Sequence, residues 1–445
     1  MLALSLALGL VAAGGHPPAF PYPVEQFVLK NGLQVIVVPR PGTGLLSYYT
    51  LVRVGSRNEV EPGRSGYAHF FEHMMFAGTP RWPSHRYEGV IKQYGANNNA
   101  YTDDDLTLYT TTGRADGLEQ FVEIEADRFQ NLSYTEAAFK TEAAAVLGEY
   151  NKAKSNPRQK MFEVLLDTAF TRHSYKHTVI GFEADIRAMP AGYQYARGFF
   201  KKYYAPDNAV LIIVGDVEVP RVKALVERAY GGWKGKAVVP RTQKEPPQKQ
   251  ERRVVVPWDK PARPRLMMGW HTPASGVETV KEAAVAGLVD DLVFGSTSPL
   301  HKDLVLDRQL CDDVGAWWQD HREPGLFFLS ATVRDATRMK EVEAAIDAAL
   351  EDVAKNGIPP ERLEAVKSHE RYAFLSQLEK DSSIADAVAN MVHLTGSLDW
   401  MEQLFAAQRE VTSEDVRAFV STWLTRNNRT VVTLQSTVPQ EQGSP

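Results

Sequence analysis

The sequence contains a single cysteine, Cys311, among its 445 residues, so no disulfide can form within the chain. A zinc site built from several cysteines is excluded for the same reason, and any metal would need histidine and carboxylate ligands. Cys311 itself is expected to be a small buried hydrophobic residue. Positive charge is not in excess either, since 50 Lys and Arg face 55 Asp and Glu. We therefore expect neither nucleic acid nor an anionic membrane surface as the main partner.

Long apolar runs are scarce, and the one that stands out lies at the N-terminus. Residues 1–15 are nearly all apolar or small, but they are too few to span a bilayer as a helix. With Pro17 and Pro18 after it, this run is similar to the core of a secretory signal, although no Lys or Arg precedes it. We therefore expect residues 1–22 to be a signal segment and the protein to be exported. No later stretch of about 18 apolar residues predicts a membrane span.

The length of the chain is sufficient for two domains. A β-hairpin is predicted around Asn31-Gly32, and strand-like and helical stretches alternate after it. Residues 236–252 are rich in proline and charge and lack apolar periodicity, which predicts an exposed linker. The pattern then repeats. We expect an α+β fold of two similar domains, residues 23–235 and 253–445, each a mostly antiparallel sheet covered by helices.

The segment from Gly66 to Thr79 has the most informative spacing. His69 and His73 are four positions apart, so on a helix both imidazoles lie on one face and can reach one ion. Glu72 lies on the same face and can approach a water molecule beside the metal without being a ligand. This is the inverted H-x-x-E-H zinc signature. So short a motif also occurs by chance, and the alternative is two ordinary surface or core histidines.

A catalytic zinc needs a third protein ligand, which is often a carboxylate when the other two are histidines. A long helix is predicted over residues 135–153. It carries Glu142 and Glu149 seven residues apart, hence on one face and two turns apart. On spacing alone, these two side chains could equally belong to a solvated helix face.

Several motifs in the same order resemble the pitrilysin (insulinase) family of zinc metallopeptidases, nearest its bacterial branch that is similar to mitochondrial processing peptidase. Residues 95–102 with 107–109 are similar to the family's G-x-x-x-N-A-x-T and T-x-Y stretch. Residues 203–209 with 214–216 resemble the motif that closes the family's first domain. The segments that carry the resemblance are residues 69–73 with Glu149, residues 95–102 with 107–109, and residues 203–209 with 214–216.

The resemblance implies that His69, His73 and Glu149 bind one Zn²⁺ per chain. Glu72 would be the general base, and Glu142 would be a carboxylate that orients a ligand histidine or the site. The implied activity is hydrolysis of short or unfolded peptides inside a closed chamber, without a covalent intermediate. The implied location of such a bacterial protein is the periplasm or the exterior.

The resemblance also implies where the peptide binds. Asn99 and Ala100 match the family's edge strand, to which the substrate adds as a further β-strand through main-chain hydrogen bonds. Such binding depends on the backbone more than on side chains, so it leaves the preferred peptide sequence open.

One feature departs from the family's pattern. Active members carry an Arg and a Tyr seven positions apart that stabilise developing charge on the substrate. The corresponding positions are Val305 and Asp312, and Arg308 nearby has no Tyr seven residues beyond it. The second domain is therefore expected to be non-catalytic. We expect a related subunit to supply the pair in a heterodimer, with a homodimer as the alternative.

Two other functions stay open at this stage. The chain could be a non-catalytic structural or assembly subunit of the same family, although its intact zinc motif argues against that role. It could also be a zinc hydrolase of a non-peptide amide, and only the family-like strand at residues 97–102 favours a peptide substrate.

Overall fold

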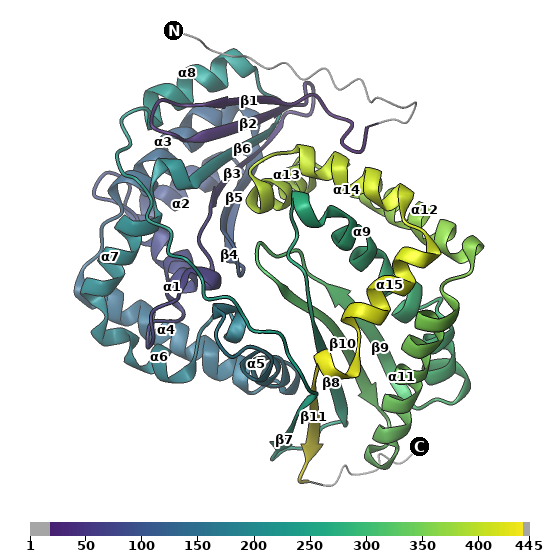
Figure 1. Ribbon diagram of the computed structural model, residues 1–445. Helices are drawn as coiled ribbons and strands as arrows, with labels where there is room; N and C mark the ends of the chain where they lie inside the picture. Colours follow the sequence, from purple (N-terminus) through teal and green to yellow (C-terminus); the bar gives the residue numbers. More distant parts are fainter. Residues whose placement is uncertain (1–17, 439–445) are drawn as a thin grey trace. The chain divides into compact units, whose positions relative to one another are not determined.

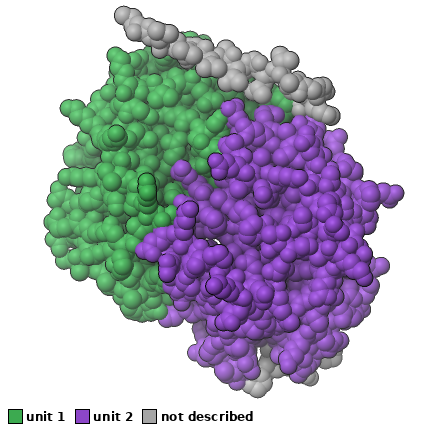
Figure 2. All heavy atoms as spheres, in the orientation of Figure 1, with its two compact units in different colours: residues 1–150, 177–242, 375–398 green, residues 151–176, 243–374, 399–445 purple. Residues whose placement is uncertain are grey.

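The computed structural model describes residues 18–438, and most of the expected signal segment lies outside them. The chain forms two compact units, which Figure 2 colours separately. The units do not divide simply at the expected linker. Residues 151–176, from the first half of the chain, belong to unit 2, and residues 375–398, from the second half, belong to unit 1. Among the described residues, unit 1 comprises residues 18–150, 177–242 and 375–398, and unit 2 comprises residues 151–176, 243–374 and 399–438.

Unit 1 contains a six-stranded sheet with the order β1-β2-β6-β3-β5-β4. Its neighbouring strands are antiparallel, except β2 and β6, which are parallel. The hairpin expected at Asn31-Gly32 is confirmed, since β1 and β2 pair across this turn. The strands are β1 (Glu25–Val28), β2 (Gln34–Pro39), β3 (Leu45–Val52), β4 (Asn97–Thr102), β5 (Thr107–Arg114) and β6 (Ala209–Gly215). The helices are α1 (Tyr67–Met74), α2 (Ser84–Gln93), α3 (Leu118–Asn131), α4 (Glu136–Lys154), α6 (Glu183–Ala188), α7 (Tyr193–Tyr203), α8 (Val219–Tyr230) and α13 (Asp381–Thr395).

Unit 2 contains a five-stranded sheet with the order β7-β11-β8-β10-β9, again with one parallel pair, β7 and β11. This order repeats that of unit 1 without a counterpart of β1. The predicted α+β fold of two similar domains with mostly antiparallel sheets covered by helices is therefore confirmed. The strands are β7 (Arg252–Trp258), β8 (Arg265–Thr272), β9 (Cys311–Trp318), β10 (Gly325–Val333) and β11 (Arg429–Ser436). The helices are α5 (Pro157–Ala169), α9 (Val280–Val289), α10 (Pro299–His301), α11 (Met339–Asn356), α12 (Pro360–Gln377), α14 (Asp399–Glu410) and α15 (Ser413–Trp423).

The exchanged segments cover the second face of each sheet. In unit 1, the adjacent residues Tyr48 and Tyr49 of β3 point to opposite faces. The hydroxyl of Tyr48 lies 2.7 Å from that of Tyr230 in α8, whereas the hydroxyl of Tyr49 donates to the carbonyl of Ser382 in α13 at 3.4 Å. Helix α13 thus packs on β3 and β6 from the face opposite α8 (Figure 1). In unit 2, α5 packs on β7, β8 and β11 in the same way.

Helix α1 is the element that positions the site, and its sequence explains its orientation. Tyr67, Phe70, Phe71 and Met74 recur at i, i+3, i+4 and i+7, and all four are buried in the core of unit 1. Because one face is anchored in this way, the opposite face, which carries the H-x-x-E-H side chains, points away from the core.

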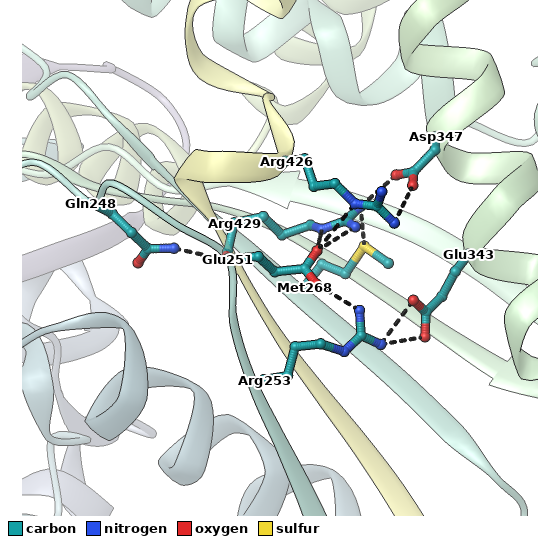
Figure 3. Close-up of polar contacts among 8 residues, drawn as sticks. All are labelled: Gln248, Glu251, Arg253, Met268, Glu343, Asp347, Arg426 and Arg429. Carbon is teal, nitrogen blue, oxygen red and sulfur yellow. Dashed lines mark hydrogen bonds and ion pairs between the residues drawn. The ribbon is translucent and has the colours of Figure 1, made fainter.

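A buried arginine joins the start of β7 to β11 and α11 in unit 2, as Figure 3 shows. The side chain of Arg429 is 1% exposed, and its guanidinium lies 2.5 Å from carboxylate oxygens of both Glu251 and Asp347. Arg253 binds Glu251 at 2.9 Å and Glu343 at 2.7 Å. A buried guanidinium needs such partners because an unpaired charge is costly in the interior. The network therefore holds the end of the expected linker region in unit 2.

Two further expectations from composition can be compared with the structure. Cys311 is buried, as predicted, and burial raises the pKa of its thiol to about 12. Across residues 18–438, none of the helices combines the length and the apolar character that crossing a bilayer requires.

Candidate metal centre

Three side chains of unit 1 converge at one point. His69 and His73 come from α1, and Glu149 comes from the C-terminal part of α4. Glu149 Oε2 lies 3.6 Å from His69 Nε2 and 3.5 Å from His73 Nε2. One nitrogen or oxygen atom from each of the three lies within 4.8 Å of the others. Spacing along the chain predicted the histidine pair, and the fold brings Glu149 to it.

This donor set suits zinc. Two imidazole nitrogens and one carboxylate oxygen form a standard ligand set for a catalytic zinc ion. Burial and, to a smaller extent, the nearby His73 lower the pKa of His69 to about 4, so His69 is neutral near pH 7, as a ligand must be. The side chain of Glu149 is 49% exposed, so solvent reaches the site.

Glu142 occupies a different place from Glu149, although both lie on α4. His73 Nδ1 donates a hydrogen bond to Glu142 Oε1 at 2.8 Å, which leaves His73 Nε2 facing Glu149. This hydrogen bond raises the pKa of His73, against the effect of burial. The geometry thus separates the two glutamates, which spacing alone left equivalent: Glu149 faces both histidines, and Glu142 is hydrogen-bonded to one of them.

Glu72 lies beside the three converging side chains but is not one of them. Its Oε2 accepts a hydrogen bond from Thr102 Oγ1 in β4 at 2.7 Å. Burial raises the pKa of Glu72, and the hydrogen bond from Thr102 opposes that rise. Sequence reasoning did not single out Thr102. Thr102 follows Ala100 by two residues, so both side chains lie on one face of the strand. This spacing was the signal in the sequence that could have identified Thr102.

The predicted substrate strand lies next to the site. Strand β4 is at the end of the sheet in unit 1, where it pairs with β5 alone among the described strands. A pocket of about 430 Å³ opens between this strand, α1, α2 and α4. The pocket is lined by Glu72, His73, Met74, Phe76, Ala77, Ser84, Asn99, Ala100, Ala138 and Glu142. Asn99 and Ala100 are therefore placed where a peptide along the edge would meet Glu72 and His73.

The positions aligned with the missing Arg and Tyr lie in unit 2. Val305 falls within a short π-helical segment, Lys302–Asp307. Arg308 Nε donates to Asp303 Oδ1 at 2.9 Å, and Asp312 Oδ1 accepts from Arg334 at 3.0 Å. Asp312, as a carboxylate, has no proton to donate to a substrate carbonyl, and Arg308 is paired with Asp303.

Unit 2 holds one other cluster of metal-type side chains among the described residues, formed by Asp291, His369 and Glu370. Burial and the hydrogen-bonded Asp291 raise the pKa of Glu370 to about 7. His369 is exposed. The unit 1 centre is the stronger candidate because it combines the helix spacing of His69 and His73 with a further carboxylate, that of Glu72, beside the three converging side chains.

Comparison with known families and proteins gives matches along most of the chain. Residues 45–182 match the family description Insulinase (Peptidase family M16), and residues 192–369 match the description Peptidase M16 inactive domain. Together these two matches take in more than half of the chain.

Matches to individual proteins point to the same family. The zinc protease PqqE of Helicobacter pylori is 28% identical over 407 residues, which is 90% of each chain. The mitochondrial-processing peptidase subunit beta of Lentinula edodes is 27% identical over 206 residues, 46% of this chain and 44% of that protein. The crystal structure of a protease from Helicobacter pylori superposes with a TM-score of 0.87 at 26% identity, covering 93% of this chain and 100% of that one.

Proposed function

Because the chain belongs to the insulinase family, peptidase family M16, we propose that it is a zinc-dependent endopeptidase that hydrolyses short or unfolded peptides. The observation that carries the proposal is the convergence of His69, His73 and Glu149 with Glu72 beside them. Relatives that are named zinc proteases support it.

In this proposal His69, His73 and Glu149 would hold one zinc ion, which when bound would supply the positive charge that polarises the peptide carbonyl and lowers the pKa of a water molecule. Glu72 accepts a proton from the attacking water on a carboxylate oxygen as the water oxygen bonds to the carbonyl carbon. Glu72 then delivers this proton to the amide nitrogen as the carbon–nitrogen bond breaks. No covalent bond to the protein forms at any step.

Two neighbours keep these groups in place. Thr102 Oγ1 donates to Glu72 Oε2 and so restricts the direction in which this carboxylate points. Glu142 accepts a hydrogen bond from Nδ1–H of His73, which leaves Nε2 without a proton and free to bind the metal.

The edge strand and the pocket support short or unfolded peptides as the substrate class. An extended peptide can add to the free edge of β4 at Asn99 and Ala100 through backbone hydrogen bonds, which a folded domain cannot offer. Apolar side chains line much of the adjoining pocket, among them Met74, Phe76 and Ala138. This lining favours an apolar residue of the peptide at that position.

We further propose that the active form is a heterodimer with a related subunit, and a homodimer is the alternative. The argument is the lack of an Arg and Tyr pair at residues 305 and 312, since such donors are worth about 10²–10³-fold in rate. A relative whose name identifies it as one subunit of a processing peptidase supports this arrangement. We also propose export, from the apolar residues 1–15.

The experiment is to incubate the purified chain, alone and with any subunit that co-purifies, with a mixture of unstructured peptides and with a stable folded domain. We expect cleavage of the peptides, faster with the partner, and no cleavage of the domain until it is unfolded. A chelator should stop the cleavage. Cutting within the ordered core of the stable domain would contradict the strand-addition proposal, and full activity of an isolated monomer would contradict the heterodimer.

A further inference from the structure

A buried carboxylate holds the N-terminus of the metal-site helix. The side chain of Glu59 is 0% exposed. Its Oε2 accepts the backbone N–H of Gly66 at 2.7 Å, and its Oε1 accepts that of Ala68 at 2.6 Å. The first N–H groups of a helix have no partner within the helix. One side chain, seven to nine residues earlier in the chain, supplies acceptors for two donors at the start of α1.

The surroundings leave the start of α1 little freedom. Gly66 has φ +89°, and a Cβ there would lie 2.3 Å from the carbonyl oxygen of Ile180, so only glycine fits. Ser65 donates to Asp185 Oδ2 from its backbone N–H at 3.0 Å and from its hydroxyl at 2.6 Å. The backbone from Ser65 to Ala68 is thus held by two carboxylates, immediately before His69.

Unit 2 offers an internal comparison. Residues 294–297, Phe-Gly-Ser-Thr, follow the helical segment after β8 as residues 76–79, Phe-Ala-Gly-Thr, follow α1. The same offset places Val277 at the position of Glu59, and Val277 is 60% exposed. At this offset, the position in unit 2 that corresponds to Glu59 therefore carries no carboxylate.

We propose that Glu59 is a positioning residue of the metal centre, which sets the direction of the first turn of α1 so that His69 Nε2 meets His73 and Glu149. This inference rests on the proposed zinc peptidase function. Groups that orient metal ligands without touching the metal typically change affinity by about 10–100-fold.

The test is Glu59→Gln, whose amide keeps the shape of the side chain but turns an NH₂ group toward one of the two N–H donors. We expect zinc binding, measured by competition with a chelator, to weaken by about 10–100-fold. In the metal-free protein, the Gly66 and Ala68 amides should exchange hydrogen faster. The visible spectrum of the Co²⁺-substituted protein should change, which a loss of stability elsewhere would not cause.

The matched control is Glu61→Gln, because Glu61 is two residues away but half exposed, with its carboxylate 3.3 Å from Lys202 Nζ. This variant should bind zinc like the unaltered chain. If Glu59→Gln also binds zinc as tightly, with an unchanged Co²⁺ spectrum, the inference is wrong while the proposed function stands. An unaltered chain that binds no zinc would instead overturn the function.

If Glu59→Gln does not fold, the unaltered metal-free chain still decides the question. The Gly66 and Ala68 amides should then be protected from exchange as strongly as amides in the middle of α1. Free exchange of these two amides would show that Glu59 does not hold the helix start in solution.

Discussion

Glu72→Gln is expected to keep one zinc ion per chain while peptide hydrolysis falls by about 10²–10⁴-fold. The amide cannot accept the proton of the attacking water, whereas His69, His73 and Glu149 remain to bind the metal. The Thr102 hydroxyl can still donate to the amide oxygen of the variant, so the side chain should stay in place. Metal analysis and the initial rate of peptide cleavage measure the two effects separately.

A suitable control for this variant is Glu136→Gln, which removes an exposed carboxylate of α4 that pairs with Lys140 at 2.9 Å. Its zinc content and rate should match those of the unaltered chain. Loss of zinc from Glu72→Gln would make Glu72 a ligand, and full activity would remove it from the mechanism.

Glu149→Ala is expected to lose both stoichiometric zinc and peptidase activity, because it removes one of only three protein ligands. His73→Ala should behave in the same way. Glu142→Ala should be milder: it removes the hydrogen bond to His73 Nδ1, so zinc affinity should fall by about 10–100-fold while a full set of ligands remains.

The comparison of the two glutamate variants decides the ligand assignment. Zinc titrations of both should show no stoichiometric binding for Glu149→Ala and saturable, weaker binding for Glu142→Ala. The reverse order would make Glu142 the third ligand, with Glu149 as the group that orients the site.

Local patterns predicted the parts of the fold and site that depend on neighbours in the chain. The alternation around Asn31-Gly32 predicted the first hairpin, and the four-residue spacing of His69 and His73 predicted that they share a helix face. The helix over residues 135–153 was also predicted, but only the resemblance to a family distinguished Glu149 from Glu142 before their contacts were known.

Contacts between distant segments could not be predicted in this way. Helix α13 has an apolar face, but periodicity does not say which sheet covers that face, and it packs on unit 1 rather than on its neighbours in sequence. Thr102 is one threonine among several until the strand is placed beside Glu72. Glu59 is an ordinary charged residue in the sequence, and its function depends on burial against the backbone of α1.

The most direct test of the zinc peptidase is to remove metal from the unaltered chain, with any subunit that co-purifies, and to titrate Zn²⁺ back while following cleavage of an unstructured peptide. We predict no cleavage without metal and a rise in rate that ends at one zinc ion per chain. Undiminished cleavage by the metal-free chain, or saturation with zinc without any cleavage, would contradict the account.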